Sequence, residues 1–454
     1  MKDLTKGSPM RLIILFALPI LFGSVFQQAY SFTDTIIIGR ELGKNSIAAV
    51  GSTASVVSLM FSTVNGLVTG FSVIIAKNFG AGDHDEMRRA IARTITFAGT
   101  ITALIILGIT LFITPLLRAL DTPESIFDEA RAYLFIVAVG LIVTVIYNLE
   151  SGILRAVGDS VIPLVILIIS AVLNIVLDLI FVCVCEWGVE GAAIATVLAQ
   201  LISAVVCFIY LIKRRPYLLV KPKDFRFNVH EAAEMLGSGF GMALMYSIVD
   251  IGSIVLQNGI NGMGEDIIAA HTAARKILSL LLMPFSAVGA TLVTYCSQNR
   301  GAGKYSRIKT GIRDGLILSF GWCTLAIALI YFGGVLLVRL ILPEEGDAIV
   351  GTSLQYLKVN VLFFYPLAVL LGVRSSLQGL GRSVVPIIAS FIELTWKVLT
   401  VIIMIPIFGY FGVILSEPII WTVCGIMIGI IAIFTLRAMP MDEATSETAG
   451  KEAL

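Results

Sequence analysis

Asn78-Phe-Gly-Ala-Gly-Asp83 recurs in the second half of the chain as Asn299-Arg-Gly-Ala-Gly-Lys304. A second motif, Leu154-Arg-Ala-Val-Gly-Asp-Ser-Val-Ile-Pro163, recurs there as Leu377-Gln-Gly-Leu-Gly-Arg-Ser-Val-Val-Pro386. Apolar helices resemble one another by chance, but these matches lie in the polar loops between apolar segments and keep a nearly constant offset. The sequence therefore predicts two related halves.

The composition indicates a membrane protein. The chain has 454 residues, of which 57% are hydrophobic and 14% charged, and its mean hydropathy is +0.95. A soluble domain usually carries about 25% charged residues. The formal net charge of +1 provides no basic field for nucleic acid. The six cysteines lack metal-ligand spacing and are interpreted as buried thiols, with a Cys183–Cys185 disulfide outside the cell as the less favoured alternative.

Twelve segments are long and apolar enough to cross a membrane, which requires about 20 apolar residues each. They fall at 12–38, 47–76, 94–117, 132–154, 161–184, 189–212, 232–258, 267–296, 312–338, 353–373, 384–407 and 410–436. Each half has six segments and therefore enters the membrane in the same orientation, which predicts a parallel repeat. We expect an all-α integral membrane fold with two pseudo-symmetric six-helix bundles.

The predicted domains follow from these segments. An N-terminal lobe covers 1–212, a polar connector 213–231, a C-terminal lobe 232–437 and a disordered cytoplasmic tail 438–454. The first apolar segment resembles a signal peptide, but no small-residue cleavage site follows it, so we expect an uncleaved transmembrane helix.

The distribution of Lys and Arg predicts the orientation. With a cytoplasmic N-terminus, the inward loops and tails hold 23 of these residues and the outward loops hold five. Cytoplasmic loops carry an excess of Lys and Arg. We therefore expect a multi-pass protein of the cell membrane with both termini in the cytoplasm.

Together, the Asn-x-Gly-Ala-Gly loops, the Leu154-Arg-Ala-Val-Gly-Asp loop, the two-fold repeat and Asp34 near the outer end of the first segment resemble the multidrug and toxic compound extrusion (MATE) transporters. The resemblance covers residues 8–437. It implies a V-shaped, two-lobe fold and export of amphipathic, often cationic, organic compounds, driven by entry of Na⁺ or H⁺ through alternating access. It also implies small-molecule substrates and no cofactor beyond the coupling ion; we further expect a monomer in the lipid bilayer.

Within the family, the chain is similar to the DinF-like branch. That pattern has an Asp in the first helix, an Asn-x-x-x-Asp pair in the fifth and a Thr in the sixth. The corresponding residues here are Asp34, Asn174, Asp178 and Thr196. The resemblance thus implies that these four side chains form the cation-coupling site.

The same residues stand out on physical grounds. An ionised side chain at membrane depth costs about 2.5–3.5 kcal/mol, so acids there are candidates for function. Asn174 and Asp178 are four residues apart and share a helix face. Two carboxylates, an amide and a hydroxyl offer only hard oxygen ligands, which suit Na⁺, and repulsion between the carboxylates also favours a proton. The alternative is that Asn174 and Thr196 bind neighbouring helices while the acids face water.

Other residues within the segments are weaker candidates. Glu393 and Lys397, at i and i+4, are expected to form an ion pair. Pro19 is expected to bend the first segment, and Pro418 to break the last one beside Glu417. Glu417 ranks below Asp250 as a functional acid. The proposed substrate cavity contains Gln27, Tyr30, Asn148, Asp250, Met283, Glu393 and Lys397.

Two other functions fit the sequence less well. A flippase for lipid-linked sugars or an exporter of polysaccharides usually has a more basic cavity, which the acids at 34, 178 and 250 disfavour. An integral-membrane enzyme is disfavoured because the three histidines are scattered. The Gly-rich loop at 78–83 also lacks the Lys-Ser/Thr pair of a phosphate-binding loop. We therefore expect no enzymatic activity.

Overall fold

The computed structural model describes residues 3–226, 228–343, 346–440 and 442, and the secondary structure of this part is entirely helical. Eleven of its helices are long and apolar enough to cross a membrane. A twelfth span is made by two shorter helices, Asp347–Leu362 and Phe364–Gly379, which meet at an angle of 56°. The all-α membrane fold predicted from the sequence is confirmed, and the segment predicted at 353–373 is a bent pair.

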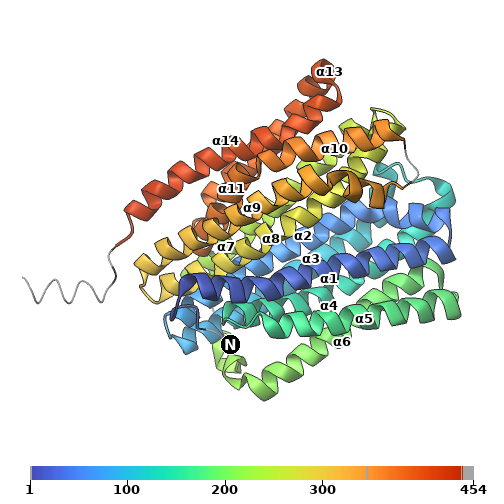
Figure 1. Ribbon diagram of the computed structural model, residues 1–454. Coiled ribbons are helices and arrows are strands. Elements are labelled where there is room, and N and C mark those ends of the chain that lie inside the picture. Colours follow the sequence, from blue (N-terminus) through green and yellow to red (C-terminus); the bar gives the residue numbers. More distant parts are fainter. Residues whose placement is uncertain (1–2, 227, 344–345, 441, 443–454) are drawn as a thin grey trace, which may run out of the picture. The chain divides into compact units, whose positions relative to one another are not determined.

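The helices of the first half begin and end close to the predicted segments. They are α1 (Pro9–Glu41), α2 (Lys44–Gly80), α3 (His84–Ala119), η1 (Glu124–Ile126), α4 (Phe127–Ala156), α5 (Val161–Asp178), η2 (Leu179–Val184) and α6 (Gly188–Arg214). Short turns η3 (Pro216–Leu218) and η4 (Pro222–Asp224) lie in the connector. Figure 1 shows α2, α3, α4, α5 and α6 as neighbouring helices, in agreement with their contacts.

The second half repeats this order. Its helices are α7 (Val229–Asn261), α8 (Glu265–Gly301), α9 (Tyr305–Ile341), α10 (Asp347–Leu362), α11 (Phe364–Gly379), α12 (Val384–Leu399), η5 (Thr400–Met404), α13 (Ile405–Phe408) and α14 (Tyr410–Arg437). Both α1 and α14 continue through their prolines, Pro19 and Pro418. The predicted break at Pro418 is therefore wrong, because the helix continues on both sides of it.

Contacts divide the chain into two compact units whose boundaries lie inside helices. The first unit contains Phe22–Leu244, and the second contains Asp3–Leu21 together with the chain from Met245. The predicted lobes, 1–212 and 232–437, place the division in the connector instead. The start of α1 thus belongs with the second half, and the start of α7 with the first. Residues 443–454 of the predicted tail lie outside the described part.

Each unit is built around a central helix. In the first unit α4 packs against α2, α3 and α6, and in the second α11 packs against α8, α9 and α14. Phe71, Leu134 and Leu141 are 0% exposed in the first core. In the second core, Tyr356 is 1% exposed and Phe364 is 0% exposed. Inside a membrane such packing depends on van der Waals contact and close approach, because lipid is as apolar as the side chains.

The glycines of the repeated loops share one backbone conformation, with positive φ. Gly82 and Gly303 lie in the first motif with φ of 75° and 67°, and Gly158 and Gly381 lie in the second with φ of 86° and 70°. Only glycine adopts this region without steric cost, and it allows the chain to leave a helix sharply. The glycine spacing that revealed the repeat thus marks four helix ends.

In the second unit the repeated loop also holds the start of the chain. The Asn299 amide donates to the Leu4 carbonyl at 3.2 Å, and Lys304 Nζ donates to the Thr5 carbonyl at 3.0 Å. In the first unit, the loop acid Asp159 pairs with Arg215 of the connector at 3.2 Å. Polar loop residues in both halves therefore hold the segments that enter or leave the helices.

Gly379→Ala is expected to destabilise the second unit. A Cβ at this position would lie 2.4 Å from the Val293 carbonyl oxygen of α8, so α8 and α11 would have to separate. Such overpacking costs about 1–3 kcal/mol. The midpoint of thermal unfolding of the purified protein should fall. Gly321→Ala in α9 is the matched control, since nothing lies within 4 Å of its Cβ, and equal midpoints for the two variants would contradict this account of the packing.

Candidate cation and substrate sites

The structure brings together the four residues of the predicted cation site. Asp34 lies on α1, Asn174 and Asp178 on α5, and Thr196 on α6. The Asn174 amide donates to the Thr196 hydroxyl at 3.4 Å. The Asp34 and Asp178 carboxylates interact electrostatically. Three helices of the first unit thus converge on one small polar region.

The oxygens of this region lack partners among the described residues. Asp178 is 0% exposed and Asn174 3%. Neither carboxylate oxygen of Asp178 accepts a hydrogen bond from the described part of the chain, and Asn174 Oδ1 and Asp34 Oδ1 are also buried without one. Buried polar atoms are nearly always hydrogen-bonded, and leaving one unpartnered costs about 1–3 kcal/mol or more when it is charged. Four such acceptor atoms in one place fit a site that takes a cation or a proton.

The donor set suits a small hard cation more than a transition metal. The described residues contain no group of three or more His, Cys, Asp or Glu side chains arranged to hold a metal ion. The site instead offers two carboxylates, one amide oxygen and one hydroxyl. Oxygen ligands of this kind favour hard cations, whereas imidazole and thiolate select softer metals.

A π-helical turn begins directly after Asp178. The turn, η2, covers Leu179–Val184, and η5 covers Thr400–Met404 in the second half, at the same offset that maps Asn78 onto Asn299. Single π-helical turns are rare and occur frequently at functional sites. At this offset, however, Asn174 and Asp178 correspond to Thr395 and Leu399. The two halves therefore share the backbone irregularity but not its acid.

Tyr133 of α4 also lies at this site, although it is not among the residues predicted from the sequence. It interacts electrostatically with both Asp34 and Asp178. Tyr30, one turn before Asp34 on α1, also interacts with that carboxylate and forms a side-chain hydrogen bond with Gln27. The repeat contained a signal for Tyr133, because the offset of the second motif pairs it with another tyrosine, Tyr356.

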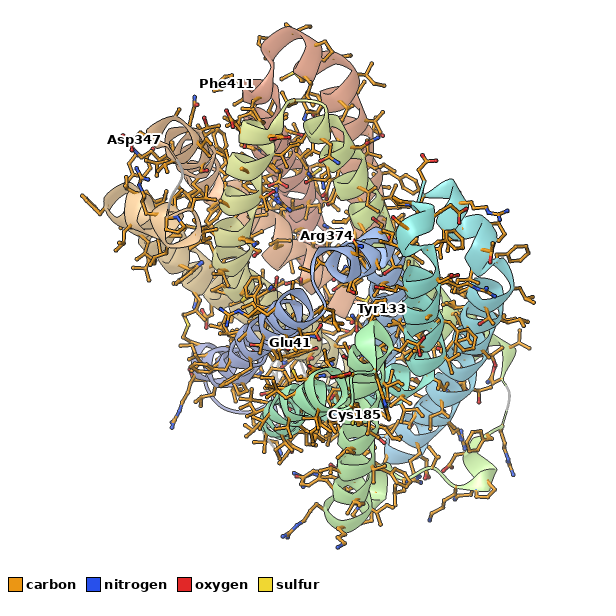
Figure 2. All side chains as sticks on the ribbon, turned by 90° about the vertical axis from the view of Figure 1, so that its right-hand side faces the viewer. Glu41, Tyr133, Cys185, Asp347, Arg374 and Phe411 are labelled. Carbon is orange, nitrogen blue, oxygen red and sulfur yellow. The ribbon has the colours of Figure 1, made fainter. Side chains whose placement is uncertain are left out.

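An acidic pocket of about 500 Å³ lies at the end of the first unit. Its acidic lining residues come from the end of α1, the start of α4 and the start of α6: Glu41, Asp128, Glu129 and Glu190. Figure 2 looks onto this end, where Glu41, Tyr133 and Cys185 are labelled. Asp34 precedes Glu41 by about two helical turns, or about 10 Å along the helix. Clustered acids next to the candidate cation site raise the local cation concentration.

In the second unit, the position equivalent to Thr196 holds an acid that is paired with an arginine. The offset of the first motif pairs Thr196 with Glu417, whose Oε1 lies 2.7 Å from Arg275 Nη1. The Tyr356 hydroxyl donates to Glu417 Oε2 at 3.4 Å. Glu417 is therefore partnered, and an arginine supplies a positive charge that the described residues of the first site do not.

The other predicted residues lie on helices of both units. The expected ion pair between Lys397 and Glu393 is confirmed at 3.0 Å, and Lys397 also donates to Ser253 at 3.3 Å. Asn148 donates to Asn65 of α2 at 3.2 Å. The remaining cavity candidates have different exposure: Gln27 is exposed, and Tyr30, Asp250 and Met283 are partly buried. That these residues line one substrate cavity stays a prediction.

Comparison with known proteins agrees with the repeat and the fold. The family model described as MatE matches residues 19–180 and again 241–403. The chain is 31% identical over 384 residues, 84% of each chain, to a probable multidrug resistance protein, YpnP, of Bacillus subtilis. It is 26% identical over 353 residues, 75% of each chain, to the probable multidrug resistance protein YoeA of the same organism. A crystal structure described as MATE in complex with MaL6 superposes with a TM-score of 0.89 at 23% identity, covering 96% of this chain and 98% of that one.

The repeated helical fold and the membrane-spanning helices define a multi-pass membrane transport protein. More particularly, the chain belongs to the MatE family, the multidrug and toxic compound extrusion transporters. The resemblance predicted from the repeated loops is therefore confirmed, while the DinF-like branch stays a prediction.

Arg275→Met is expected to destabilise the second unit, because it leaves the buried Glu417 carboxylate without its cation. The cost should be about 1–3 kcal/mol, measured as a lower midpoint of thermal unfolding. Adding Glu417→Gln to the same chain removes the stranded charge and should recover most of the loss. A double variant no more stable than Arg275→Met alone would show that the ion pair does not set the stability here.

Proposed function

We propose that the protein is a cation-coupled exporter of amphipathic, often cationic, organic compounds. The observation that carries this proposal is the cluster of unpartnered oxygens on Asp34, Asn174 and Asp178. A folded protein keeps such a cluster at a cost in stability, which is understandable where binding of an ion offsets it. The relatives named as multidrug resistance proteins support the substrate class.

The negative charge of the two carboxylates couples ion binding to a change in the arrangement of the helices. Empty, the site places two carboxylates within reach of one another, and their repulsion disfavours this arrangement. A bound Na⁺ or proton removes the repulsion and allows α1 and α5 to approach. A ligand shifts a conformational equilibrium only by its difference in affinity for the two states. Here that difference arises because only the closer arrangement supplies all the oxygens at once.

Both Na⁺ and H⁺ suit this site, and the role of the remaining polar residues is clear for either ion. Asn174 and Thr196 complete an oxygen shell for Na⁺, or accept and donate hydrogen bonds around a protonated acid. The acidic pocket supplies cations to the site from one end of the first unit. We further propose that both chain termini lie in the cytoplasm, as the Lys/Arg distribution predicts, so that this acidic end faces outward.

Asp34→Asn and Asp178→Asn should each abolish ion-driven efflux of a cationic dye from proteoliposomes. An amide neither binds a proton in this range nor carries the charge that attracts Na⁺. Both variants should unfold at a temperature no lower than the parent, because the substitution removes a buried charge without a partner. Asp85→Asn, an exposed acid on α3, is the matched control and should transport normally. Full transport by both site variants would refute the proposed coupling site.

Imposed gradients should identify the coupling ion. Efflux of the dye is measured with an inward Na⁺ gradient at equal pH, and separately with an inward proton gradient without Na⁺. We expect at least one gradient to accelerate efflux in the parent, and the Asp178→Asn variant to lose that acceleration. An efflux rate that neither gradient changes would contradict cation coupling, even if the dye still moves down its own gradient.

A further inference from the structure

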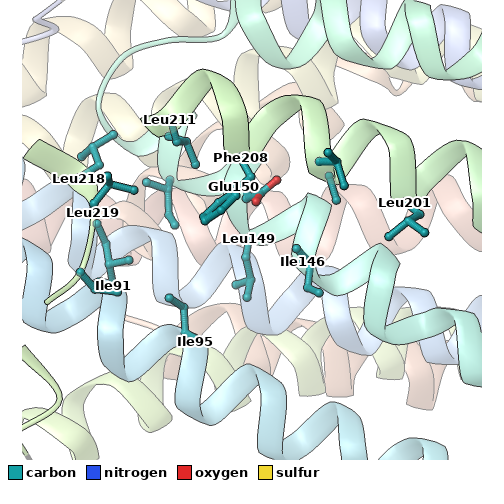
Figure 3. Close-up of a pocket in the computed structure, with 14 residues that line it drawn as sticks. Ile91, Ile95, Ile146, Leu149, Glu150, Leu201, Phe208, Leu211, Leu218 and Leu219 are labelled. Carbon is teal, nitrogen blue, oxygen red and sulfur yellow. The ribbon is translucent and has the colours of Figure 1, made fainter. Parts of the chain in front are cut away.

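A second pocket of the first unit lies at the connector end of its helices. It has a volume of about 440 Å³ and is lined by 14 residues of α3, α4, α6 and the connector. Figure 3 shows Glu150 among isoleucine, leucine and phenylalanine side chains. Among the described residues that line the pocket, thirteen are apolar and Glu150 is the only ionisable one. This volume suits a small organic molecule.

Glu150 is buried without a counter-ion in the described part of the chain. It is 8% exposed, and its Oε2 atom has no hydrogen-bond partner there. The side-chain hydrogen bond of Glu150 is with the thiol of Cys207, which is a weak donor. None of the ion pairs among the described residues includes Glu150. In these surroundings the acid is neutralised by a proton or paired with a positive charge on a ligand.

This pocket is separate from the candidate cation site. Glu150 and Tyr133 both lie on α4, toward opposite ends of that helix. At 1.5 Å per residue their separation is about 25 Å along the helix. Glu150 is in the last two turns of α4, which ends at Ala156, and is therefore close to the connector. The mechanism proposed above makes no use of it.

The lining residues indicate how a ligand would enter. Ile95, Val205 and Phe208 are 42%, 49% and 50% exposed, on helices that are long and apolar enough to span the membrane. Entry from the lipid therefore requires no polar path. A lipid acyl chain would match the apolar walls but leave the carboxylate unpaired, whereas an organic anion would be repelled. The ligand that satisfies both features has an apolar body and one positive charge.

We propose that the pocket formed by α3, α4, α6 and the connector binds a lipophilic monovalent cation, with the Glu150 carboxylate as its counter-ion. Such a site differs in position from the candidate coupling site and holds the organic cation rather than Na⁺ or H⁺. Its test does not depend on the proposed exporter function, because the effect of the Glu150→Gln substitution on binding is measured without any gradient.

Two probes of nearly equal shape and opposite charge test the proposal. Equilibrium dialysis measures binding of tetraphenylphosphonium and, separately, tetraphenylborate to the purified full chain, corrected for empty detergent micelles. The parent should bind the phosphonium at least tenfold more tightly than the borate. Glu150→Gln should weaken phosphonium binding at least tenfold, and the variant should no longer discriminate between the two probes. Glu124→Gln, an exposed acid in η1 that lines neither this pocket nor the acidic pocket, is the matched control and should behave as the parent.

A steric variant locates the bound cation in the pocket. Ala204→Phe fills the apolar wall without changing any charge, and should also weaken phosphonium binding at least tenfold. Unchanged affinity in Glu150→Gln would overturn the proposal. So would equal affinity of the parent for both probes, which would indicate an apolar occupant such as an acyl chain. This comparison in the parent needs no variant, so equal affinities would overturn the proposal even if either substitution prevents folding.

Discussion

The cost of leaving an ionised group without a partner inside a membrane controls how charge is distributed in this protein. Where a partner is available, the acid is ion-paired, as Glu417 is with Arg275 and Glu393 is with Lys397. Where the described residues provide none, as at Asp178 and Glu150, the free energy of folding is less favourable. We attribute these exceptions to ligands that supply the missing charge: a coupling cation at Asp178 and an organic cation at Glu150.

The two halves share backbone features, but the side chains of the candidate ion site occur in only one of them. The two halves share loops that end in glycines with positive φ, and each has a π-helical turn at the same offset. These features are backbone requirements, and both halves need them to turn and pack in the same way. The side chains around the turns differ: the first half has Asn174 and Asp178, and the second has Thr395 and Leu399. Duplication therefore provided the scaffold, while the proposed ion coupling depends on one half.

The acidic pocket and the candidate cation site differ in depth, and therefore in how strongly water screens their charges. Glu41, Asp128, Glu129 and Glu190 lie at the helix ends, where water screens them and their effect is to concentrate cations. Asp34 and Asp178 lie about two turns deeper, where screening is weak and a single bound charge changes the local energy greatly. In the proposed mechanism, an ion attracted at the surface reaches a site where its binding changes the arrangement of the helices.

Hydropathy and the loop repeats were sufficient to predict twelve spans and two related halves, and the resemblance that the loop motifs carry supplied the family and the four residues of the candidate cation site. These properties are local or periodic, so the sequence contains them directly. Only the tertiary structure decided which acids have partners, because Arg275 of α8 reaches Glu417 of α14 from far earlier in the chain. The same holds for Glu150, whose apolar surroundings come from α3, α6 and the connector. A sequence shows that a charge is present, but the neighbours that neutralise it or leave it exposed to a ligand are set by packing between distant segments.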